Sequence, residues 1–328
     1  MRKLIMAALA VTVLFCSGCF LKELFSFRNT IDGDKVSKNS DSQAPYIEAS
    51  PINQNKTAGE YVEMADYALD KGDTGEAIRY CNEALKLKPD MPEAYFTIGV
   101  AYYKQLDYAS ALDNLNKSLK IEPNLTLAHA YIGSIYYSKG DYEKSVKEYT
   151  LVIDKFKFFS TLYNHRGLAY LMLGRPDDAI KDFKNSIEQD DHDPAGYENR
   201  AFAYLFKGEV AKAEEDLEKA LKINPNLASA YETKALIAIM DGQLDAAGKL
   251  LDTGISHDPG RPLGYYYRAF VNVKTGKKSL AELDIQKGIG RDRKINMEVR
   301  NILKTLVLKY PETRAGKVIS EIAQNIKA

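Results

Sequence analysis

The side chains that most often carry out chemistry in proteins are sparse in this sequence. Its four histidines are His129, His165, His192 and His257, and none has metal-ligand spacing to another histidine or to a cysteine. The acidic run 190–193 lacks the alternating ligands and the turn glycine of a calcium loop, so we interpret it as a polar turn, with a metal site as the alternative. The sequence also has no phosphate-binding glycine loop and no Gly-x-Ser-x-Gly motif. It therefore predicts a protein that is not an enzyme and holds no metal and no cofactor.

The three cysteines direct attention to the N-terminus. Cys16, Cys19 and Cys81 are too few for a disulfide framework. Residues 1–19 combine a basic start with an apolar run over 4–15 that is too short to span a bilayer, as in a secretory signal. The run ends in Cys-Ser-Gly-Cys, which resembles the processing box of bacterial lipoproteins, although Cys16 stands where that family prefers leucine. The resemblance implies a signal peptide over 1–19 and acylation of Cys19; an ordinary signal peptide or an uncleaved anchor is the alternative.

The residue after the cysteine bears on the membrane. It is Phe20, and not the aspartate that resembles an inner-membrane retention signal, which implies the outer membrane with the rest of the chain facing the periplasm. Several acyl chains would give the stable anchoring that one chain does not. Residues 20–57 are predicted to be a flexible tether, because residues 37–56 are rich in polar residues and proline and show no helical period.

Most of the remaining chain repeats with a period of thirty-four residues. In segment 92–123, small residues stand at Gly99, Ala111 and Ser118, with large apolar residues between them at helical spacing. Small side chains let two helices approach closely while large ones fill the adjoining space. A fixed period of this length predicts a stacked array of helix-turn-helix units.

This pattern resembles the tetratricopeptide repeat, over about three quarters of the chain. The units begin at Ala58, Pro92, Thr126, Ser160, Pro194, Ala228 and Pro262. The turn inside each unit carries Gly72, Gly140, Gly174, Gly208, Gly242 and Gly276, with Leu106 as the exception. The resemblance implies an all-α fold: a right-handed superhelix (α-solenoid) of about seven helix-turn-helix repeats over residues 58–295.

The sequence departs from the family pattern at the proline that closes a unit, which Lys157, Asp191 and Arg293 replace, and in two further places. Arg166, Arg200, Lys234 and Arg268 stand where the family usually has leucine, and we expect their stems to cover apolar surface while their heads reach water. Residues 296–328 lack the repeat. They are predicted to form C-terminal capping helices, because an apolar stripe runs from Val299 to Val307 at helical spacing. A partner-binding helix is the alternative.

The family resemblance also implies a binding surface, because in tetratricopeptide arrays the first helix of each unit lines a concave groove. The eleven groove candidates are Phe96, Tyr103, Tyr131, Tyr137, Asn164, His165, Leu168, Asn199, Phe202, Tyr266 and Phe270. The fifth position of the units holds no lysine, which disfavours a clamp for an acidic peptide terminus. We expect the groove to receive an apolar helix or an extended segment. The alternative is that these side chains only fill a tight superhelix, and a charge substitution such as Phe202→Glu would distinguish the two.

The charge composition and the signal at the N-terminus together suggest a class of function. The formal net charge is zero with acids and bases interspersed, which excludes the concentrated basic face needed for nucleic acid. The sequence predicts a non-catalytic, lipid-anchored scaffold that gathers proteins or peptides of the bacterial cell envelope. The resemblance to tetratricopeptide lipoproteins associated with solute transporters gives the alternative, a periplasmic protein that binds a small ligand in a sealed cavity. Self-association is left open.

Overall fold

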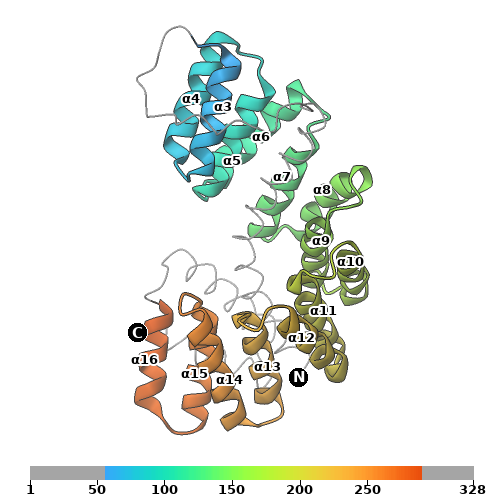
Figure 1. Cartoon of the computed structure of the whole chain (residues 1–328), viewed down its shortest axis with the longest axis vertical. Helices are drawn as coiled ribbons and strands as arrows, with labels where there is room; N and C mark the ends of the chain where they lie inside the picture. The colour runs from blue at the N-terminus through green and yellow to red at the C-terminus, as the bar shows by residue number, and fades with distance from the viewer. Residues whose placement is uncertain (1–55, 290–328) are drawn as a thin grey trace, which may run out of the picture. The chain divides into compact units, whose positions relative to one another are not determined.

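The computed structural model describes residues 56–289, and every regular element in that range is an α-helix (Figure 1). Fourteen helices follow one another there and pack as seven consecutive pairs, which confirms the predicted all-α array of helix-turn-helix units. The predicted signal peptide, most of the predicted tether and the predicted capping helices lie outside the described residues. The helices are α3 (Ala58–Asp70), α4 (Thr74–Leu87), α5 (Pro92–Lys104), α6 (Tyr108–Ile121), α7 (Thr126–Ser138), α8 (Tyr142–Lys155), α9 (Ser160–Met172), α10 (Pro176–Gln189), α11 (Pro194–Lys207), α12 (Val210–Ile223), α13 (Ala228–Met240), α14 (Leu244–His257), α15 (Pro262–Lys274) and α16 (Lys278–Ile289).

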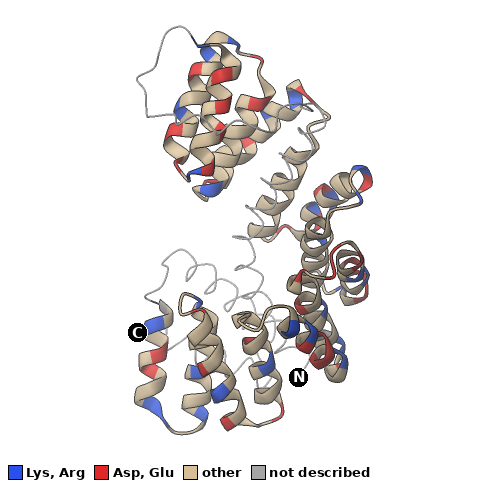
Figure 2. Ribbon diagram, viewed as in Figure 1, with Lys and Arg blue, Asp and Glu red and all other residues tan. Residues whose placement is uncertain are grey.

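The described residues form two compact units that meet in sequence at Lys157 and Phe158. We call them the N-terminal unit, with α3 to α8, and the C-terminal unit, with α9 to α16. The boundary falls in an aromatic segment where lysine replaces the proline that closes other repeats. Phe158 itself is 82% exposed. In both units, acidic and basic residues are interspersed along the helices (Figure 2).

The turns inside the pairs follow from backbone geometry. The six glycines predicted at these turns all have left-handed φ angles, between 76° and 84°. The predicted exception, Leu106, adopts the same region with φ 62°. A residue with a Cβ adopts this conformation at a cost, whereas glycine does not. The repeat geometry is therefore strong enough to impose a left-handed turn on a leucine.

Close helix crossings explain the small residues of the repeat. A Cβ built on Gly99 of α5 would lie 2.7 Å from Cγ of Leu115 on α6. A Cβ built on Gly167 of α9 would lie 2.6 Å from Cε1 of Phe183 on α10. Leu115 and Phe183 are fully buried, so neither can move away easily. The spacing of small and large residues thus determines where the two helices of each pair approach closely.

The arginines that replace leucine make a contact that the sequence did not predict. Each pairs with a buried aspartate sixteen residues later, on the second helix of its own unit, while the arginine side chains remain 15–21% exposed. The pairs are Arg166–Asp182, Arg200–Asp216 and Arg268–Asp284. The expectation considered the arginine alone and did not include the aspartate at the facing position, which supplies a bidentate partner. Lys234 of α13 is half-buried, and the position sixteen residues later on α14 of the same unit holds Leu250 in place of the aspartate.

None of the helices from α3 to α16 combines the length and the apolar character that crossing a bilayer requires.

Candidate functional site

In the N-terminal unit, the groove candidates form an aromatic cluster on α5 and α7. Tyr131 of α7 makes edge-on contacts with Phe96 and Tyr103 of α5, with ring centroids 5.6 Å apart in each pair. These three side chains are buried. Tyr137 is half-buried and contacts the ring of Tyr142 edge-on at 5.3 Å. The structure therefore brings these candidates together, and it uses most of them to pack successive first helices against each other.

In the C-terminal unit, most groove candidates are buried as well. Those with little exposure are Asn164, Leu168, Asn199, Phe202 and Tyr266, whereas His165 and Phe270 are half-buried. Phe202 is only 2% exposed, so Phe202→Glu would place a charge inside the protein and is expected to unfold it. The half-buried positions Tyr137 and Phe270 are better probes of binding because they combine a groove position with partial access.

A buried polar row occupies the fifth repeat position of the C-terminal unit. Its members at that position are Asn164, Glu198 and Glu232, and their side-chain partners are Asn199, Ser229 and Arg261. Ser229 donates its hydroxyl to Glu198 at 2.8 Å. Arg261 donates from Nη2 to Glu232 at 2.9 Å, with Nε at 3.3 Å from both carboxylate oxygens. The amide of Asn199 donates to Asn164 at 3.4 Å.

Burial changes the protonation of this row. Desolvation raises the pKa of Glu198 to about 7, against the opposing effects of Arg261 and Ser229. Desolvation also raises the pKa of Glu232, even though Arg261 favours its charged form. Desolvation lowers the pKa of His165 to about 4, so its imidazole is neutral and Nδ1 donates to the carbonyl of Thr161 at 2.7 Å. The row thus holds two carboxyl groups that bind protons more tightly than usual close to one guanidinium.

Sequence reasoning identified Asn164 and Asn199 of this row as groove candidates and missed the charged members. Glu198 and Glu232 stand at the fifth repeat position, which was noted only for its lack of lysine. Sequence reasoning did not identify Arg261, the last residue of the repeat that contains Glu232, which lies directly before α15 and reaches Glu232 twenty-nine positions earlier. The signal that could have found it is the repeat itself, since residues about one period apart lie side by side in stacked units.

The acidic run after α10 has the expected polar-turn character. Asp190, Asp191 and His192 are all exposed, and one ligand atom from each lies within 4.8 Å of the others. His192 Nδ1 lies 2.6 Å from Asp191 Oδ1, so these two groups already satisfy each other. Exposed acidic groups of this kind are common without a metal, and this cluster carries no metal assignment.

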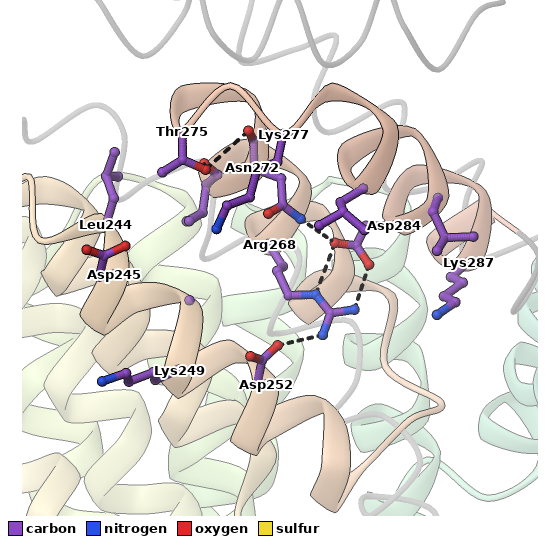
Figure 3. Close-up of a pocket in the computed structure, with 14 residues that line it drawn as sticks. Leu244, Asp245, Lys249, Asp252, Arg268, Asn272, Thr275, Lys277, Asp284 and Lys287 are labelled. Carbon is purple, nitrogen blue, oxygen red and sulfur yellow. Dashed lines mark hydrogen bonds and ion pairs between the residues drawn. The ribbon is translucent and has the colours of Figure 1, made fainter.

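A different feature, a hollow of about 670 Å³, lies between α14 and α16 with α15 as its floor (Figure 3). Arg268 of α15 stands at its centre and binds both walls. Its Nη1 lies 2.7 Å from Asp252 of α14, and its Nη2 lies 2.6 Å from Asp284 of α16. Asn272 also donates to Asp284, at 3.0 Å. The walls of the hollow are second helices of the repeats and its floor is the first helix α15, but none of the groove candidates lines it.

Comparison with known proteins agrees with this architecture. Family models described as TPR repeat or tetratricopeptide repeat match residues 68–105, 92–125, 128–154, 160–193 and 194–227. Three of these matches begin at residues predicted to open a unit. The chain is a tetratricopeptide repeat protein.

Solved structures with the same fold include two with substantial overlap. A tetratricopeptide repeat protein from Parabacteroides merdae is 19% identical, with a TM-score of 0.66 over 83% of this chain and 99% of that one. PilF from Pseudomonas aeruginosa is 17% identical, with a TM-score of 0.54 over 65% of this chain and 96% of that one. At these identities the likeness establishes the fold and not the function. No curated protein matches this sequence significantly.

Proposed function

We propose that this chain is a non-catalytic scaffold, anchored to the membrane of a bacterial cell envelope through a lipid on Cys19, that gathers partner proteins. The observation that carries the proposal is the array itself. Seven described helix pairs follow one another in sequence, and arrays of such pairs bind proteins or peptides along extended surfaces. The part of the proposal that concerns the membrane rests on the sequence of residues 1–20.

The alternative, a small-ligand protein, would be favoured by a sealed cavity with convergent polar groups. The hollow between α14 and α16 is instead bordered by exposed leucines, with Leu280 51% and Leu283 45% exposed. An open surface with exposed apolar side chains suits a macromolecular partner better than a small enclosed ligand. We therefore favour the scaffold.

The anchor is tested by metabolic labelling with an alkyne analogue of palmitate in the source bacterium. The wild-type chain and Cys16→Ser should both carry the label and fractionate with the outer membrane. Cys19→Ser should lose the label and leave the membrane fraction. Labelling of Cys19→Ser, or recovery of the wild type without lipid, would contradict the anchor.

The scaffold is tested separately by site-specific photo-crosslinking in the same cells. A photoreactive residue at Tyr137 or Phe270 probes the groove, and one at the exposed Glu218 on α12 is the matched control. We expect discrete crosslinked proteins from the groove positions that are absent from the control. If all three positions give the same products, or none, the groove does not bind partners.

A further inference from the structure

The hollow between α14 and α16 arises from one missing side chain. Gly248 of α14 occupies repeat position twenty-one, at which the first four units carry Ile78, Leu112, Val146 and Ile180. A Cβ at Gly248 would meet only Cγ1 of Val271, at 3.9 Å, which is an ordinary contact. A larger residue would therefore fit here, and its absence leaves the space open.

The walls of the hollow present apolar surface to solvent. Leu280 and Leu283 lie three residues apart on α16 and are about half exposed, while Val271 on the floor is buried. The lining residues of α14 run from Leu244 to Asp252, or about 12 Å along a helix axis. This matches about two turns of a second helix. Recognition of a helix in a groove uses apolar anchors at this spacing.

Some charged side chains around the hollow have an ion-pair partner and others have none. Arg268 already holds Asp252 and Asp284. Within the described part of the chain, the lining lysines Lys249, Lys277 and Lys287 make no ion pair, and neither does the lining carboxylate of Asp245. Three ammonium groups and one carboxylate thus stand unpaired around a hollow with both polar and apolar lining, and their net positive charge favours an occupant with carboxylates.

We propose that this hollow is a docking groove for an acidic amphipathic helix of a partner protein, with aliphatic side chains against Leu280 and Leu283 and carboxylates near the three lysines. None of the residues that line this site is a groove candidate, so it goes beyond the scaffold groove proposed above. Two surfaces would let one chain hold two partners at once.

Charge distinguishes this occupant from the chain's own continuation. Residues 296–310 carry an apolar stripe, but their ionisable residues are Glu298 against Arg300, Lys304 and Lys309. A basic segment would meet the three lysines with like charge, which is unfavourable. A partner with the opposite charge is therefore the better match.

The test uses fluorescence anisotropy with the full chain in detergent and detergent alone as the blank. The probes are two labelled helical peptides of about three turns with the same leucine stripe, one flanked by glutamates and one by lysines. We expect the glutamate peptide to bind about tenfold more tightly than the lysine peptide, and to weaken as salt is added.

Variants locate the binding. Gly248→Leu fills the hollow and should weaken the glutamate peptide about tenfold, whereas Gly75→Leu, at an exposed helical glycine of α4, should leave it unchanged. The double change Lys277→Glu with Lys287→Glu should reverse the preference between the peptides. Lys278→Glu, at an exposed position that does not line the hollow, is the control.

Several outcomes would overturn the proposal. One is equal binding of the two peptides, and another is a Gly248→Leu chain that binds as the wild type does. Tighter binding of a peptide with the sequence of residues 296–310 would assign the groove to the chain itself. Sedimentation that shows self-association of the wild type and none for Gly248→Leu would assign it to a second copy.

Discussion

The pair Arg200–Asp216 allows a sharp test of how the C-terminal unit is stabilised. Arg200 donates from Nε at 2.7 Å and from Nη2 at 2.8 Å to the two carboxylate oxygens of Asp216. The arginine side chain is 17% exposed and the aspartate side chain 3%. The hydrogen bond to Asp216 is the main cause that raises the pKa of Arg200. The pair is therefore a buried, bidentate ion pair that links the two helices of one unit.

The structure determines the expected cost of breaking it. Arg200→Leu leaves the carboxylate of Asp216 buried without its guanidinium, and loss of one partner of a buried pair costs about 3–5 kcal/mol. Asp216→Leu leaves a guanidinium that is slightly more exposed, so we expect about 3 kcal/mol. The double variant with leucine at both positions should lie within about 1 kcal/mol of the wild type, because well-packed apolar residues replace buried pairs at little cost. The N-terminal unit already uses Met64, Ile98 and Ile132 at the position of Arg200.

The assay is urea unfolding of the full chain, followed by circular dichroism, for the four members of this double-mutant cycle. The exposed pair Lys117–Asp113, with side chains 51% and 60% exposed, is the control. Lys117→Ala should cost less than about 0.5 kcal/mol. The reasoning fails if each single change at Arg200 or Asp216 costs as little as the control, or if the double variant loses the sum of the two single losses.

Three further predictions concern protonation and packing. The folded wild type binds a proton at Glu198 more tightly than the unfolded chain does, so this group lowers the free energy of unfolding as pH rises from 4.5 to about 7. Relative to wild type, the free energy of unfolding of Glu198→Gln should therefore rise by up to about 3 kcal/mol across that window, as measured by urea unfolding at each pH. His165 acts in the opposite direction, because its lowered pKa makes the wild type lose stability as pH falls from 6.5 to about 4. Relative to wild type, the free energy of unfolding of His165→Gln should rise by up to about 3 kcal/mol as pH falls. A difference between the two proteins that does not change with pH would refute the neutral imidazole. Gly167→Ala forces a methyl group against buried Phe183 and should lower the free energy of unfolding by about 1–3 kcal/mol, while Gly75→Ala, whose Cβ meets only Asp73 at 3.6 Å, should raise it by about 0.5–1 kcal/mol; equal effects in thermal unfolding would refute the close crossing.

The fold could be predicted because the same types of residue recur at the same structural positions in seven units. A left-handed turn favours glycine, and Leu106 could be recognised as an exception from the sequence because six other units have glycine there. The crossing at Gly99 could be predicted for the same reason, since a small residue recurs wherever two helices meet closely. Each of these sequence patterns is weak by itself, but together they predict the architecture because they recur at a fixed period.

The candidate site could be predicted only in part. The repeat placed Phe96 and Phe202 on the first helices, but position on a face does not say how much of that face neighbouring side chains cover. The pairing of Arg261 with Glu232 depends on the stacking offset between units, which a one-dimensional pattern does not contain. The sequence likewise shows Gly248 as one glycine among many, and only the distance to Val271 shows that its missing side chain leaves a hollow.

The hollow and the buried ion pairs have a common origin in the last units of the array. Arginine at the seventh repeat position requires a carboxylate on the facing helix, and Arg268 finds one in Asp284 as the other arginines do. Arg268 alone among the three pairs described here also reaches Asp252 on the preceding unit, across the space that Gly248 leaves open. One guanidinium on the floor thus holds both walls of the hollow at a fixed separation (Figure 3). A groove whose width is set before a partner arrives loses less conformational freedom on binding. Gly248 and Arg268, which both depart from the repeat pattern, are therefore the residues that form the hollow and set its width.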